Sequence, residues 1–178
     1  LPWLIKEHSE LGKHYLNAAF GDEGSLAGSK SYKPYITLSR SNHLTSILNK
    51  KDRFDLEKTV RPLMKRRKFP TGHKIESTTF TMVKSKVKKA LAKKIENNGI
   101  SKMIMAESKL LNELGIETRM WISRLSRTQT GAYSLTTAIF INRKKSVLKF
   151  YKEIGFSLSR KQTKLENCLK EVGWINGS

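Results

Sequence analysis

The stretch YLNAAFGDEGSL occupies residues 15–26 and joins an apolar segment to two acids and a glycine. Apolar side chains recur at helical spacing in and just before it, namely Leu11, Tyr15, Leu16, Ala18, Ala19 and Phe20. This periodicity predicts a helix over residues 7–21, with Ser9 as its N-cap and Gly21 as the residue that stops it. The helix is therefore expected to run directly into the two acids.

A β-hairpin is expected directly after this helix. Residues 28–33 have the composition of a turn, and residues 35–40 alternate between polar and apolar side chains. Because successive side chains of a strand point to opposite faces, Ile36 and Leu38 are expected in the core. The opposite, polar face would then carry Tyr35, Thr37 and Ser39.

A second helix and a second hairpin follow further along the chain. Apolar spacing predicts a helix over residues 102–114, stopped by Gly115. Strands are expected at residues 116–127 and 132–141, because both segments are rich in β-branched and aromatic residues. The interior is expected to hold Met120, Ile122, Leu135 and Ile139. The other face is expected to show Arg119, Trp121, Ser123, Ser134 and Thr136, with Arg124 and Arg127 near the turn.

The charge of the chain is strongly positive. Its 178 residues hold 35 Lys and Arg against 15 Asp and Glu, a formal net charge of +20. Residues 50–102 alone hold 17 Lys or Arg and 5 acids, a net of +12. One such run is ordinarily a solvated helix face, but several in succession favour contact with the phosphates of a nucleic acid.

Other partners and sites are not indicated. The sequence has no run of 18 or more apolar residues, so nucleic acid is favoured over a membrane surface and a soluble, intracellular protein is expected. The single cysteine, Cys168, has no partner for an internal disulfide, and the four histidines lack metal-ligand spacing.

Taken together, residues 15–26 resemble the LAGLIDADG motif of homing endonucleases, in which an apolar helix with small residues runs into an acid, a glycine and a strand. Residues 107–116 are similar to the second helix of that family, residues 121–141 to its second hairpin and residues 149–169 to its closing helices. The resemblance covers residues 1–42 and 106–172.

The resemblance implies an α+β fold, an αββ-αββα unit with a curved antiparallel four-stranded sheet. The chain would form one domain over residues 1–178, with residues 43–105 as a basic, mostly helical insertion.

The family's activity implies a site-specific endonuclease that hydrolyses duplex DNA with a divalent metal, usually Mg²⁺. By position in the motif, Glu23 is the catalytic, metal-binding acid and Gly24 lies beside it in the metal site. Lys161 matches a basic catalytic residue, although a phosphate anchor without a catalytic part is an equal alternative, and Arg160 stands next to it. The family commonly has Asp where this chain has Gly21.

The resemblance also implies a DNA-binding face and a pairing of motif helices. DNA contacts are expected from Lys33, Tyr35, Thr37, Ser39, Arg119, Trp121, Ser123, Arg124, Arg127 and Arg160. Close packing of two motif helices requires small side chains, and the expected interface residues are Tyr15, Asn17, Ala18 and Ala19. One motif supplies one set of carboxylates, so a homodimer is expected, or else a second LAGLIDADG half upstream.

Two other functions are compatible with the sequence. The same scaffold could serve a non-catalytic DNA or RNA binder, such as a regulator or an intron maturase, and Gly21 and the basic insertion are the signs in its favour. Residues 80–114 could instead form a helix-turn-helix of a generic regulator, although the expected turn is longer than that motif usually has.

Overall fold

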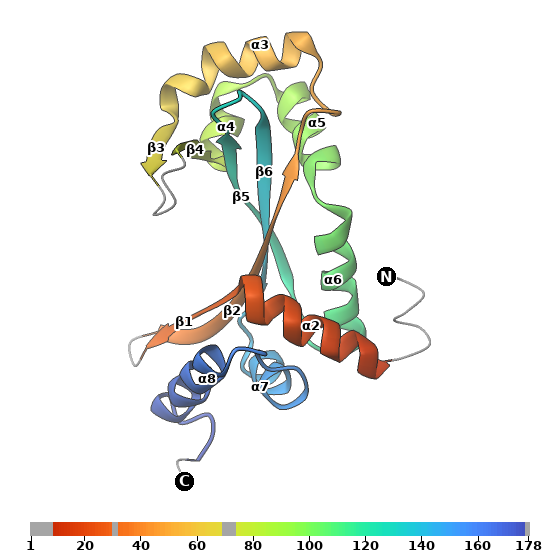
Figure 1. Ribbon diagram of the computed structural model, residues 1–178, viewed down its shortest axis with the longest axis vertical. Coiled ribbons are helices and arrows are strands. Elements are labelled where there is room, and N and C mark those ends of the chain that lie inside the picture. Colours follow the sequence, from red (N-terminus) through yellow and green to blue (C-terminus); the bar gives the residue numbers. More distant parts are fainter. Residues whose placement is uncertain (1–8, 30–31, 69–73, 177–178) are drawn as a thin grey trace. The chain divides into compact units, whose positions relative to one another are not determined.

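The computed structural model describes residues 9–29, 32–68 and 74–176. Within these residues the expected α+β class is confirmed, and a helix followed by a hairpin occurs twice along the chain (Figure 1). The helices are α2 (Ser9–Glu23), α3 (Lys50–Thr59), η1 (Arg61–Leu63, a 3-10 helix), α4 (Phe80–Lys86), α5 (Lys89–Gly99), α6 (Lys102–Glu113), α7 (Lys144–Glu153) and α8 (Ser159–Glu171). The strands are β1 (Gly24–Ser29), β2 (Tyr32–His43), β3 (Lys65–Lys68), β4 (Lys74–Thr79), β5 (Arg119–Arg127) and β6 (Tyr133–Ile141).

The described strands form one sheet in the order β1-β2-β6-β5-β4-β3. The expectation of four strands is therefore wrong, because β3 and β4 add to the sheet from within the segment expected to be an insertion. β4 pairs antiparallel with β5, for example Thr78 with Leu125, and β3 pairs with β4. Neither KRRK nor KIESTT has the apolar alternation that marks a strand, and a lysine-rich edge strand is a common defence against pairing with other chains.

The chain divides into two compact units. Unit 1 comprises Leu1–Ser39, Met103–Trp121 and Ala138–Ser178, and unit 2 comprises Arg40–Lys102 and Ile122–Thr137. Unit 2 thus takes in nearly all of the segment expected to be inserted, together with the end of β2 and the tip of the β5–β6 hairpin. The expectation of a single LAGLIDADG-type domain stays a prediction.

The core of unit 1 forms where α2 and the closing helices meet. Leu16 and Phe20 of α2 are fully buried. The Phe20 ring lies 4.8 Å from that of Phe150 on α7 and 6.4 Å from that of Phe156, in edge-on contacts typical of aromatic cores. Helix α2 extends through Glu23, two residues beyond the expected stop at Gly21.

The first hairpin of unit 1 confirms the alternation predicted for it. Ile36 and Leu38 of β2 are fully buried, and the register pairs them with Leu26 and Gly24 of β1. The side chains that alternate with them, Tyr35, Thr37 and Ser39, point to the other face of the sheet and are partly exposed.

The second hairpin departs from its predicted pattern on β5. Leu135 and Ile139 of β6 are fully buried, as expected, but Met120 is 45% exposed and Trp121 beside it is 57% exposed. Neither face of β5 is covered at this point, so alternation along the strand carries no information about burial there. The fully buried residue of β5 is Leu125, in unit 2.

Unit 2 has its own core beneath α3, α4 and α5. It contains Leu44, Leu48, Leu56, Val60, Phe80, Val83, Leu91, Ile95, Leu125, Tyr133 and Leu135. Helix α3 begins with a capping box, in which the Asn49 side chain accepts from the Asp52 backbone N–H and the Asp52 carboxylate accepts from the Asn49 N–H. These bonds fix the start of α3 independently of its packing.

Candidate active-site corner and nucleic-acid interface

Helix α2 passes into strand β1 without an intervening loop. Glu23 is the last helical residue and Gly24 the first of the strand, and both Asp22 and Glu23 are exposed. A Cβ atom at position 24 would lie 2.4 Å from the Phe20 carbonyl oxygen and 2.8 Å from its Cα, so only glycine fits this junction. The tight junction holds the backbone of Glu23 between the end of a helix and the edge strand of a sheet.

Lys161 of α8 caps the C-terminal end of α2. Its ammonium group donates to the carbonyl oxygens of Gly21 (2.5 Å), Asp22 (3.2 Å) and Gly24 (2.7 Å). The last turn of α2 contains no basic residue of its own, so α8 supplies the positive charge that the negative end of the helix dipole favours. Lys161, which the resemblance implies to be catalytic, therefore has a structural role at the end of α2.

A pocket of about 370 Å³ opens beside this corner. It is lined by Gly24, Ser25, Leu26, Arg160, Lys161 and Lys164. Lys164 also donates to the Leu26 carbonyl at 3.4 Å, and Arg160 is exposed. No side chain caps the N-terminus of α8, so the positive end of this helix adds to the charge of Arg160 and Lys164 at the pocket.

A divalent metal fits this corner only in part. Glu23 is an exposed carboxylate, the kind of oxygen ligand that Mg²⁺ takes. Gly24 was expected to lie in the metal site; its carbonyl oxygen accepts a hydrogen bond from the Lys161 ammonium, and its part in holding a metal stays a prediction. Within the described residues, no group of three or more His, Cys, Asp or Glu side chains is placed to hold a metal ion.

The glycine that departs from the family pattern lies against the loop between α7 and α8. A Cβ atom on Gly21 would lie 1.7 Å from the Ser157 hydroxyl oxygen and 2.9 Å from its Cβ. The Ser157 N–H donates to the Asn17 carbonyl at 3.3 Å, which holds the loop close to the helix. The place where the family's aspartate side chain would begin is thus filled by Ser157.

The open face of the sheet in unit 1 is polar and aromatic. The hydroxyls of Ser25 and Thr37 are 2.6 Å apart, and the Tyr35 ring lies 6.0 Å from that of Phe140 on β6. Of the predicted DNA contacts on β2, Lys33 is exposed and Tyr35, Thr37 and Ser39 are partly exposed. Sequence reasoning missed Ser25 and Phe140, although Ser25 directly follows the motif glycine.

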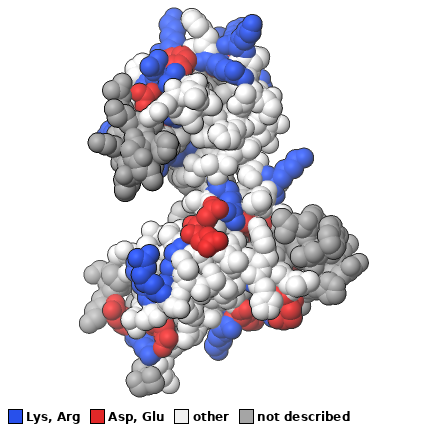
Figure 2. Space-filling view, viewed as in Figure 1, with Lys and Arg blue, Asp and Glu red and all other residues white. Residues whose placement is uncertain are grey.

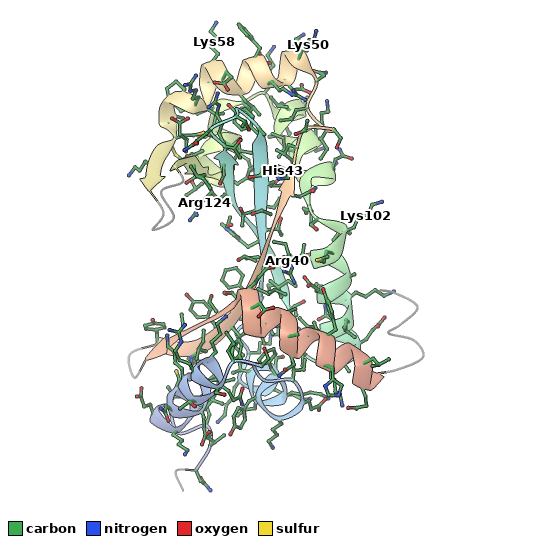
Figure 3. The ribbon with its side chains drawn as sticks, in the orientation of Figure 1. Arg40, His43, Lys50, Lys58, Lys102 and Arg124 are labelled. Atoms are coloured by element: carbon green, nitrogen blue, oxygen red, sulfur yellow. The ribbon has the colours of Figure 1, made fainter. Side chains whose placement is uncertain are left out.

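The predicted contacts on β5 have different surroundings. Arg119 and Trp121, in unit 1, are exposed. In unit 2, Ser123 donates to the Thr136 carbonyl at 3.1 Å, and Arg124 is partly exposed on β5 (Figure 3). Arg127 is engaged inside unit 2, because its Nε donates to Glu57 at 2.6 Å and its Nη1 lies 3.7 Å from Glu76. The side chain of Arg127 is only 17% exposed, so a contact with a base would require its ion pair with Glu57 to open, and the DNA contact stays a prediction.

The residues expected to pair two copies of α2 do not share one face. Asn17 donates to the Ile154 carbonyl at 2.7 Å, Ala19 is buried, and Tyr15 donates to Glu107 at 2.7 Å. Ala18 is exposed, and it shares the outward side of the helix with Leu11 and Asp22. An interface on α2 would therefore be centred on Ala18, with Asn17 and Ala19 serving the interior of unit 1.

Positive charge is concentrated in unit 2. By sequence, unit 2 has 20 Lys and Arg against 5 Asp and Glu, a net of +15, and unit 1 has 15 against 10, a net of +5. Figure 2 shows the basic side chains that project from the visible surface. The segment with the most charge is therefore not the one that carries Glu23.

Comparisons of the chain with family models, with curated proteins and with solved structures give no match. In the described part of the chain, no helix has the length and apolar character that crossing a membrane requires.

Proposed function

We propose that the protein binds duplex DNA and that its Glu23 corner is one half of a site that hydrolyses phosphodiester bonds. The observation that carries this proposal is the position of Glu23. An exposed carboxylate stands at the end of α2, one residue from a pocket whose Arg160 and Lys164 suit a phosphate group. Nucleases that use metal ions need this combination of an acid and an anion-binding surface.

The open face of unit 1 supplies groups that suit the major groove. Lys33, Tyr35 and Thr37 alternate along β2, and hydroxyl and ammonium groups can donate to the acceptors on base edges. A two-stranded β-ribbon fits within the major groove, so β1 and β2 form the reading element. The net charge of +20 supports phosphate contacts of the same complex.

Each residue of the corner has a separate role in this proposal. Arg160 and Lys164 would hold a phosphate, and Lys161 fixes the end of α2 on which Glu23 stands. Magnesium, when bound through Glu23 and the matching carboxylate of a second copy, supplies Lewis-acid stabilisation of the phosphate charge. One chain offers one such carboxylate, so hydrolysis requires two chains brought together at α2.

One observation favours a second candidate, a DNA or RNA binder without hydrolytic activity. The Lys161 ammonium group already neutralises the carbonyl oxygens at the end of α2, including that of Gly24. A fixed cation at this place lowers the attraction for a divalent ion, because like charges repel at close range.

Incubation of the full chain with a randomised duplex library, with and without Mg²⁺, tests the proposal. Selective binding together with cleavage that requires Mg²⁺ supports the nuclease. Selective binding without cleavage in any divalent metal supports the second candidate. Absence of selective binding overturns both.

A further inference from the structure

Helix α3 of unit 2 carries an exposed phenylalanine between two lysines. Phe54 is 67% exposed, more than any other large apolar side chain in the described part of the chain. Lys50 and Lys58 lie one helical turn before and after it, and both are exposed. Because residues four apart share a helix face, the three side chains form a row in which two ammonium groups flank an aromatic ring. This row is called the α3 row below.

The α3 row points away from the rest of unit 2. Leu56 on the inner side of α3 is fully buried in the core of the unit. Figure 3 shows Lys50 and Lys58 near opposite ends of α3, on the side of the helix turned away from the strands of unit 2. Phe54 has no ring contact with another aromatic side chain of the described residues.

Four of the five acids of unit 2 pair with cations outside the row, and the fifth, Asp55 beside Phe54, forms no ion pair in the described part of the chain. Asp52 is 2.6 Å from Lys94 and Glu57 is 2.6 Å from Arg127, so both acids pair with cations that lie outside α3. Glu96 pairs with Lys84 at 2.7 Å. In the described part of the chain, Lys50 and Lys58 enter no ion pair, and the outward side of α3 keeps their charge.

We propose that the α3 row binds an unpaired segment of nucleic acid, with the Phe54 ring stacked on a base and the two lysines on phosphates. A lone exposed phenylalanine is common and needs no ligand. A phenylalanine set between unpaired cations, in a unit of net charge +15, has the chemistry of single-strand binding, where aromatic rings stack on bases and cations follow the backbone. Lys50 and Lys58 are eight residue steps apart on the helix, roughly 12 Å along its axis, which leaves room for one base between two phosphate contacts. The inference does not depend on the activity proposed for Glu23.

The binding of labelled 15-residue oligo(dT) and oligo(U), and of a 15-base-pair mixed-sequence duplex, to the full chain tests the proposal. Phe54→Ala should weaken binding to the single strands by roughly 5-fold to 150-fold, the range that corresponds to the loss of one stacked base. Binding to the duplex should change by less than about twofold, because its bases are already stacked. The two single strands also show whether deoxyribose or ribose is preferred.

Matched variants separate this row from general electrostatic attraction. Met82→Ala removes another exposed apolar side chain of unit 2, and it should leave single-strand binding unchanged. Lys50→Gln with Lys58→Gln should reduce the slope of log affinity against log salt by about 1.4, the value for two phosphate contacts on a single strand. Lys89→Gln with Lys93→Gln, which removes two exposed lysines of α5, serves as the charge-matched control and should change the slope less.

The proposal is overturned if Phe54→Ala leaves single-strand binding unchanged, or weakens binding to the single strands and to the duplex equally. It is also overturned if Met82→Ala has the same effect as Phe54→Ala. Because Phe54 is mostly exposed, its replacement should leave the thermal unfolding midpoint nearly unchanged, and that measurement accompanies each variant.

Discussion

The ammonium group of Lys161 donates to the Gly24 carbonyl oxygen at 2.7 Å and joins two segments that lie 137 residues apart. The same group donates to the Gly21 carbonyl, so one side chain closes both the end of α2 and the start of β1. Helix carbonyls at a C-terminus lack partners within the helix, and a lysine from elsewhere in the fold satisfies them here. The position of Glu23 depends on this contact.

Replacing Lys161 by Met should lower the free energy of unfolding by about 1–3 kcal/mol, because charge-assisted bonds to the α2 end are lost. Urea unfolding measures the change. Lys164→Met is the matched control on the same helix, since Lys164 makes a single, longer contact of 3.4 Å with Leu26. Equal effects of the two substitutions would contradict the capping role.

Introducing a side chain at Gly21 should destabilise unit 1. The Cβ of Ala at this position would overlap the Ser157 hydroxyl, at a cost of about 1–3 kcal/mol for overpacking. Ser157→Gly should recover part of that loss in the double variant, because it removes the overlapping atoms. Thermal or urea unfolding of the two single variants and the double variant gives the coupling energy. Strictly additive effects would show that the two residues are not in contact.

Lowering the pH should destabilise unit 2, because it protonates the Glu57 carboxylate. Partial burial acts to raise the pKa of Glu57, but the hydrogen bond from Arg127 and the charges of Arg127 and Arg61 outweigh it, so the pKa lies below its ordinary value of 4.5. A carboxyl whose pKa is lowered by folding stabilises the fold above its unfolded pKa, and that stability is lost as the pH falls through the folded pKa. Unfolding free energies measured from pH 6 downward should fall below pH 4.5, and Glu57→Gln should flatten the dependence. An unchanged acid profile in that variant would argue against the ion pair.

Raising the pH should destabilise unit 2, because it deprotonates the Tyr133 phenol. Burial, and after it the nearby Glu57 carboxylate, raises the pKa of Tyr133 to about 12 from an ordinary value of 10.0. Since folding favours the neutral phenol, Tyr133 contributes to the free energy of unfolding below pH 10. This contribution is lost as the pH rises through 12. Ultraviolet absorbance of tyrosinate should contain a component that titrates late, and Tyr133→Phe should remove that component. Titration of every tyrosine near pH 10 would contradict this assignment.

Pairing of two chains should depend on Ala18. Its side chain is exposed on α2 between Leu11 and Asp22, and Ala18→Arg would place a long charged group in a close helix contact. Sedimentation of the wild type and the variant should show loss of the dimer. His14→Arg, on an exposed residue one turn earlier, indicates how far the interface extends. If the wild-type chain binds DNA as a monomer, the proposal that two chains form the hydrolytic site is contradicted.

Local patterns predicted the first half of the fold well. The alternation through Ile36 and Leu38 and the helical spacing through Leu16 and Phe20 correspond to buried faces, because each segment packs against a single layer along its length. Met120 was misassigned since β5 is uncovered where it begins. Strands β3 and β4 were missed because charged residues dominate them and their pairing partners lie far away in the sequence.

The resemblance predicted that Lys161 and Arg160 lie near the end of the first helix, and the contacts of Lys161 with Gly21 and Gly24 agree with that grouping. The catalytic role of Glu23 stays a prediction. That the Lys161 ammonium caps α2, that Arg127 is held by Glu57, and that Asn17 faces inward are tertiary relationships. No local spacing encodes these contacts, because each joins residues from separate elements of the chain.

Glu23→Gln tests the central claim most directly, on a duplex site selected from a random library in the presence of Mg²⁺. The substitution keeps the size of the side chain and removes its charge. We expect cleavage to be lost while DNA affinity changes less than about threefold, and Asp22→Asn to retain most of the cleavage, since the resemblance places Glu23 and not Asp22 at the metal position. Cleavage that survives in Glu23→Gln would contradict the assignment of Glu23 as the hydrolytic carboxylate.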